Sequence, residues 1–186
     1  MKKAFLPIIL FSAALSMMSG CYCIRGLGSN ASDTSMYDSV ILHHWDSTFA
    51  AIIKNPVKGR IFKLNPMEKP GNSNDNIAGY PIESTSQQMN AEQLAILKFI
   101  LSNEKCYSND SNLIKTYFAP YLAVEFYNKK KKMYLLIGYN TPEWAVATQD
   151  TLIKRGRYSR KDLLLQFATG VYPDDEYLKS IQNINK

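Results

Sequence analysis

The chain has 186 residues, with 22 Lys and Arg against 16 Asp and Glu, and a formal net charge of +6. This mildly basic balance is not the profile of a dedicated nucleic-acid binder, and the length suits one domain with a real hydrophobic core. The only two histidines are adjacent and the three cysteines form no Cys-x-x-Cys pair, so the sequence predicts neither a zinc site nor a cofactor.

The first 20 residues have the order of a secretory leader. Lys2 and Lys3 precede an apolar run of 15 residues, from Ala4 to Met18. This run is shorter than the ~20 residues that cross a bilayer as a helix, and Pro7 makes a permanent membrane helix unfavourable. We expect residues 1–20 to be removed, which takes away two lysines and no acid and lowers the net charge from +6 to +4.

The end of this leader, Met18-Ser19-Gly20-Cys21, resembles the lipobox of bacterial lipoproteins. The resemblance implies cleavage before Cys21, diacylation of its thiol and acylation of the new amine. Two or three acyl chains anchor a protein stably, whereas one binds a membrane only marginally. In this family Tyr22, in place of Asp, implies the outer membrane, with the domain facing the periplasm. The alternatives are an ordinary signal peptide with a chance cysteine and an N-terminal membrane anchor.

Two cysteines remain if Cys21 carries lipid. An oxidising periplasm would permit a bridge between Cys23 and Cys106. The alternatives are a second acylated or free thiol at Cys23 and a half-buried thiol at Cys106. Residues 21–35 are rich in Gly, Ser and Asn, which predicts a flexible tether with an r.m.s. span of about 20 Å. Residues 36–186 are expected to form a single domain.

That domain is predicted to be α+β, with a small, mostly antiparallel sheet, a central hairpin, and helices packed against it. Helical spacing of apolar residues predicts helices over Met36–Asn55 and Ala91–Ser102. Asn90 and Gln93 have the spacing of a capping box at the start of the second helix. Near the C-terminus, Ser159 is expected to cap a helix that Gly170 ends, and the residues around Pro173 are expected to open a last helix through Ile181.

The strongest strand signal predicts an antiparallel hairpin. Residues 121–127 and 133–139 are rich in Tyr, Val, Phe and Ile, and carry apolar residues on both faces, so they belong in the middle of the sheet. Further strands are predicted over residues 58–64, 77–84 and 144–148, and an extension of the last toward residue 153 is an alternative. Pro81 makes the strand over 77–84 an edge strand, because proline cannot donate a ladder hydrogen bond.

A Tyr-bearing loop and the segment Phe118-Ala119-Pro120 lie between the Ala91–Ser102 helix and this hairpin. This order resembles small bacterial lipoproteins and secreted domains of unknown function. The resemblance carries no catalytic residues.

The densest charge lies in the predicted hairpin turn, at Lys129, Lys130, Lys131 and Lys132. These lysines would suit contact with anionic lipid phosphates or with an acidic protein partner. The alternative is solvated charge that guards strand edges against aggregation. Residues 154–161 hold a second basic cluster with the same two interpretations.

Candidate catalytic groups are few. Adjacent histidines on a helix point about 100° apart, so His43 and His44 suit a polar helix face better than a shared metal ion. Glycoside hydrolysis needs two carboxylates beside one bond, and Glu125 and Glu143 are the only candidates near the strands. The sequence has no Gly-x-Ser-x-Gly elbow.

The sequence therefore predicts a non-enzymatic, lipid-anchored module that binds another protein, for example an inhibitor or immunity-type lipoprotein. Its twelve tyrosines agree with a binding surface but equally with a core. The alternatives are an accessory subunit of an envelope complex and a small envelope hydrolase of cell-wall or glycan material. The hydrolase requires Glu125, Glu143, His43 or His44 to meet in one cleft.

Overall fold

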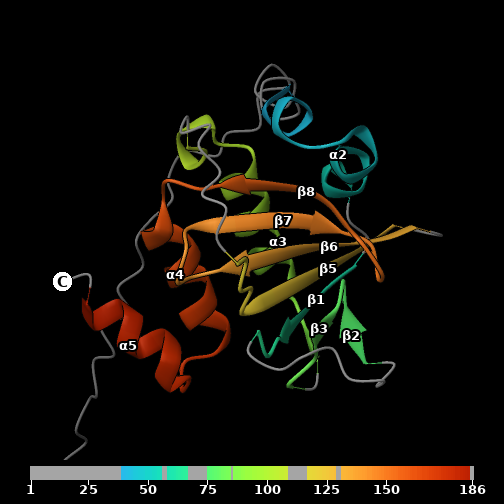
Figure 1. The fold of residues 1–186 in the computed structure, drawn as a ribbon. Coiled ribbons are helices and arrows are strands. Elements are labelled where there is room, and N and C mark those ends of the chain that lie inside the picture. Colours follow the sequence, from blue (N-terminus) through green and yellow to red (C-terminus); the bar gives the residue numbers. More distant parts are fainter. Residues whose placement is uncertain are drawn as a thin grey trace, which may run out of the picture.

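A six-stranded antiparallel sheet organises the chain, as a computed structural model shows for residues 39–55, 58–66, 75–84, 86–108, 117–128 and 131–184. The strand order is β4-β1-β5-β6-β7-β8 (Figure 1). The strands are β1 (Lys58–Lys63), β4 (Gln87–Gln88), β5 (Leu122–Asn128), β6 (Lys131–Gly138), β7 (Glu143–Ala147) and β8 (Leu152–Arg157). The fold is therefore α+β, and the predicted hairpin, β5–β6, lies in the middle of the sheet.

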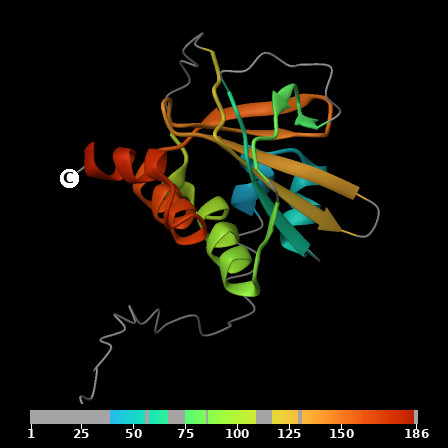
Figure 2. The same cartoon turned by 90° about the horizontal axis from the view of Figure 1, so that it is seen from below.

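Helices cover one face of this sheet (Figure 2). They are a helix at residues 39–44, α2 (Ser47–Lys54), α3 (Ala91–Leu101), α4 (Lys161–Val171), α5 (Glu176–Ile184) and the 3₁₀ turn η1 (Glu104–Cys106). Alternate residues of the central strands, such as Val124, Leu135 and Trp144, meet these helices in the main hydrophobic core. Side chains alternate between faces along a strand, so the intervening residues point to the other side.

The second face carries a smaller core that includes Phe62, Ala123 and Leu136. A two-stranded sheet of β2 (Asn76–Ile77) and β3 (Tyr80–Pro81) packs there, with Ala78 and Gly79 in the turn at φ 52° and 86°. The single strand predicted over residues 77–84 is therefore wrong: that segment turns back on itself. Left-handed backbone at two successive residues makes the tight turn that joins β2 to β3.

The helix predicted over Met36–Asn55 is also not continuous. Helical structure stops at residue 44 and resumes at Ser47, because Asp46 is extended and accepts hydrogen bonds from the amides of Thr48 (2.8 Å) and Phe49 (3.0 Å). These bonds satisfy amides that begin a helix, so Asp46 caps α2.

Two strands follow the hairpin where one was predicted, since β7 ends at Ala147 and β8 begins at Leu152. The predicted cap at Ser159 is wrong as well. Its hydroxyl donates to the carbonyl of Lys105, and α4 begins after Arg160 without a side-chain cap. Gly170 lies inside α4, which ends one residue later.

Candidate interaction surface

The structure describes only part of the residues that the sequence singled out. Cys21, Cys23, Lys129 and Lys130 lie outside the described residues, so the lipidation site and half of the lysine run remain predictions. Cys106 is a free thiol, and it is buried rather than half-buried, with 1% of its surface exposed. Burial raises the pKa of this thiol, which opposes formation of the reactive thiolate. Its bridge to Cys23 gains no support from this geometry.

His44 packs the N-terminal helix against the 3₁₀ turn and the residue that follows it. The His44 ring stacks on Tyr107, with ring centroids 3.6 Å apart, and its Nε2 lies 2.9 Å from Glu104 Oε1. His43 meets His44 edge-on at 4.8 Å. No group of three or more metal-ligating side chains occurs in the described part of the chain. These contacts give His44 a structural role, because its ring packs the helix face against Tyr107 and Glu104.

Glu125 and Glu143 point to the same face of the sheet but lie far apart on it. Glu125 is opposite Tyr134, Tyr134 is opposite Ala147, and Glu143 lies four residues before Ala147 on β7. This register separates the two glutamates by about 13 Å along the strands and about 10 Å across them. Each carboxylate is also paired with its own arginine. The hydrolase alternative therefore loses the carboxylate pair on which it depended, since such pairs lie about 5–9.5 Å apart.

The sheet instead brings basic and aromatic residues together beside the hairpin turn. Lys58, Tyr127 and Lys132 lie directly opposite one another on β1, β5 and β6. Two residues further along the same strands, Arg60 is opposite Glu125. We call Lys58, Arg60, Tyr127 and Lys132 the hairpin-end patch. Tyr127 remains 38% exposed and the Arg60 and Lys132 side chains are 42% and 44% exposed, so the patch faces solvent.

Glu125 lies beneath the patch and fixes two of its three cations, Arg60 and Lys132. The Arg60 guanidinium donates to both carboxylate oxygens, Nε to Oε1 at 2.9 Å and a terminal nitrogen to Oε2 at 3.0 Å. Lys132 Nζ lies 3.3 Å from Oε2. A buried carboxylate needs such charged partners, and a two-bond contact with arginine holds both groups in a defined geometry.

Tyr134 completes this network from the interior. Its hydroxyl lies within hydrogen-bond distance of Glu125 Oε2 (3.1 Å) and Gln149 Oε1 (2.6 Å). Burial, together with the negative charge of Glu125, raises the pKa of Tyr134, so its hydroxyl stays protonated and acts as a donor. The amide of Gln149 in turn donates to the carbonyl of Asn76 in β2. The patch is thereby connected to the small sheet on the same face.

Two of the five cations in the second basic cluster are paired with acids. Arg155 forms a 2.6 Å ion pair with the buried Glu143, and Arg160 forms one of 2.6 Å with Asp162. The Arg160 guanidinium lowers the pKa of Asp162, which keeps that carboxylate ionised. This cluster therefore presents less unbalanced positive charge than its sequence indicates.

The lysine run in the sequence marks Lys132, but Lys58 and Arg60 were not predicted. Their neighbours on β5, Tyr127 and Glu125, are more than sixty positions away in the sequence, so no local pattern brings the patch together. The alternation Lys58-Gly59-Arg60 within a strand was the available signal, because it places both cations on one face. Lys131 belongs to the opposite face by the same rule.

Comparisons with protein-family models, with curated proteins and with solved structures find no match for this chain. Within the described ranges, the helices are too short or too polar to cross a bilayer.

Proposed function

We propose that this chain is a non-enzymatic protein-binding module, held at the outer membrane by lipid on Cys21 and facing the periplasm. The observation that carries the proposal is the hairpin-end patch, in which three cations surround an exposed tyrosine. Tyrosine and arginine are the residues most enriched where proteins bind one another. With a single carboxylate against three cations, the patch suits an acidic partner surface.

Within this function, the chain would act as an inhibitor or immunity-type protein, or alternatively as an accessory subunit of an envelope complex. An inhibitor of this kind would neutralise a toxin through an acidic surface of the toxin. Fixed cations suit this task, because charge complementarity accelerates encounter and disfavours wrong partners.

The patch is tested by affinity capture of the full-length chain from membranes. The double variant Lys58→Ser, Lys132→Ser removes two exposed cations, and Lys105→Ser, Lys161→Ser is a control with the same change in net charge. We expect the original chain and the control to retain one specific partner and the patch variant to lose about tenfold in affinity, since an exposed charge pair contributes up to about 1 kcal/mol. A partner retained equally by all three would rule out the patch, and no specific partner at all would rule out the binding module.

The anchor has its own test. The Cys21→Ser chain should fail to incorporate palmitate and should leave the membrane fraction. Continued labelling and membrane fractionation would show that Cys21 is not the lipidated residue.

A further inference from the structure

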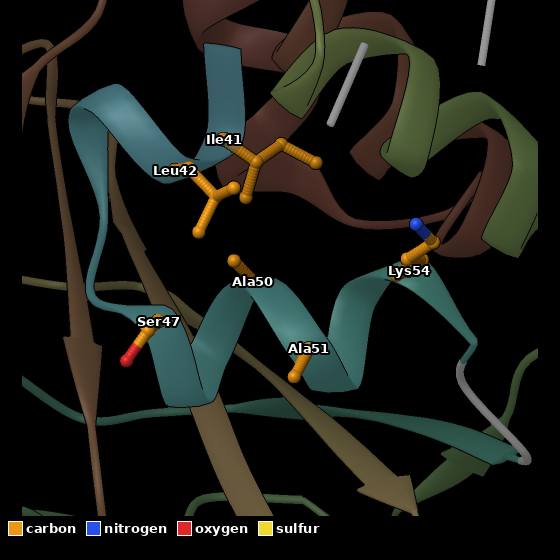
Figure 3. A pocket seen from close by; sticks show the side chains of 6 residues that line it. All are labelled: Ile41, Leu42, Ser47, Ala50, Ala51 and Lys54. Carbon is orange, nitrogen blue, oxygen red and sulfur yellow. The ribbon is translucent and has the colours of Figure 1, made fainter. Parts of the chain in front are cut away.

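A second feature near the hairpin end is a groove between the helix at residues 39–44 and α2 (Figure 3). Ile41, Leu42, Ala50 and Ala51 make its lining largely apolar, with Ser47 and Lys54 completing it. In Figure 3, Ile41 and Leu42 come down from one helix toward Ala50 on the other, and the Lys54 amine lies at the end of the groove. Leu42 is 54% exposed, so its side chain can be reached from solvent.

The groove has a basic end. Lys54 is the last residue of α2, and Lys98 Nζ donates to the carbonyl of Lys54 at 3.0 Å. Four residues after Lys54 the chain reaches Lys58, the first residue of the hairpin-end patch. On the helix-covered face, α2 also packs against β5 through Phe49 and Phe126, whose ring centroids are 5.9 Å apart. The Lys54 end of the groove is therefore near Lys58, but the groove lies over the helix-covered face and the cationic patch lies on the opposite face of the sheet.

The volume of the groove decides what kind of group it can hold. It measures about 220 Å³, below the ~300–1,000 Å³ of sites that enclose a small molecule. An open slot of this size accommodates one or two protruding aliphatic side chains. At interfaces such an anchor in a pocket contributes more than the surrounding contacts.

We propose that the groove is the anchoring pocket for the same acidic partner, and this inference rests on the protein-binding function proposed above. The occupant is a protein segment in which an aliphatic side chain enters between Leu42 and Ala50. A carboxylate next to that side chain faces the ammonium groups of Lys54 and Lys98. Further acidic residues of the segment continue past Lys54 and around the end of the sheet to Lys58 and the hairpin-end patch.

The test uses two synthetic peptides of equal length and charge, each rich in glutamate, one with a pair of leucines at its centre and one with serines there. Binding to the full-length chain in detergent is measured by fluorescence anisotropy. We expect the leucine peptide to bind about tenfold more tightly, since the groove removes part of the leucine side chain from water.

Two substitutions then locate the leucines. Ala51→Gln obstructs the groove without changing charge, and Ala91→Gln makes the same change at an exposed alanine on α3. Ala51→Gln should remove the preference for leucine, while Ala91→Gln and the unmodified chain keep it. Equal binding of both peptides to the unmodified chain, or an unchanged preference in Ala51→Gln, would overturn the groove proposal.

The failure of the proposed function has a different signature. If neither peptide binds, or if Lys58→Ser, Lys132→Ser leaves both affinities unchanged, the acidic-partner function itself is wrong. Vesicles of anionic phospholipid give a third comparison. If the unmodified chain binds these vesicles and Ala51→Gln abolishes that binding, the groove receives a lipid chain, and the protein-segment proposal is overturned.

Discussion

Asp175 is the residue whose replacement tests the C-terminal part of the fold most directly. Its carboxylate receives a 2.6 Å ion pair from Lys63 on β1, a 2.7 Å hydrogen bond from the Tyr121 hydroxyl and a 3.0 Å bond from the amide of Leu178 in α5. One buried side chain thus joins the last helix to the sheet. Burial alone would raise the pKa of Asp175, but these three donors outweigh it and hold that pKa below the usual value.

Asp175→Asn keeps the side chain's shape and a carbonyl acceptor for Leu178 but removes the charge. We expect the free energy of unfolding to fall by about 1.5–3 kcal/mol at pH 7, the contribution of a hydrogen bond to a charged group. Asp175→Ala should cost about 1 kcal/mol more, because the helix cap is lost too. Asp174→Asn is the control: that neighbouring carboxylate is fully exposed and lies 3.6 Å from Lys179, so its loss should leave stability unchanged.

The pH dependence provides the decisive comparison. A carboxyl group whose pKa is lowered by folding stabilises the folded state above its unfolded pKa of about 3.9, and that stabilisation is lost as pH falls through the folded pKa. Urea unfolding curves at pH 7 and at progressively lower pH should therefore converge for the original chain and Asp175→Asn. A stability difference that stays constant down to the lowest pH would refute the assignment of charge as the cause.

Substitutions in three other sets of contacts are also tested by urea unfolding. Arg60→Met should destabilise the fold more than Glu125→Gln, by about 1–2 kcal/mol, because it leaves a buried carboxylate short of a partner, whereas the exposed guanidinium can be hydrated; the opposite order would contradict the network. Tyr107→Phe should cost about 1–3 kcal/mol, since its hydroxyl accepts from Trp45 Nε1 (2.8 Å) and donates to the Leu101 carbonyl (2.6 Å), and an unchanged midpoint would mean that water replaces it. Asp46→Ala should cost about 1 kcal/mol and Asp46→Asn much less, because asparagine also caps helices; equal losses would argue against a capping role.

Features that depend on neighbours in the sequence were predictable. The capping box of α3 is confirmed: Gln93 N donates to Asn90 Oδ1 at 2.8 Å and Asn90 N donates to Gln93 Oε1 at 3.0 Å. The central hairpin is confirmed for a related reason, since its two apolar runs are separated by a short polar turn. In both cases the interacting residues are close along the chain.

Features that depend on competition between local and distant partners were not predictable from the sequence. Apolar residues continue at helical spacing through Trp45 and Phe49, so periodicity alone could not reveal that Asp46 ends one helix and caps the next. Ser159 has the residue type of a cap, but the Lys105 carbonyl, more than fifty positions away, receives its hydroxyl. Residue type fixes what a side chain can bind, and only the packed chain decides which partner is near.

For the same reason, the run Lys129–Lys132 predicted only one residue of the hairpin-end patch, Lys132. Counting charges favours the densest run, yet an exposed lysine that no neighbour orders must lose side-chain freedom when it binds a partner. On the sheet face, Glu125 cancels one positive charge but holds Arg60 and Lys132 in fixed positions. Because these side chains are already ordered, they lose less conformational entropy when a partner binds them. The buried carboxylate therefore favours the hairpin-end patch as a binding surface, although it lowers the net charge there.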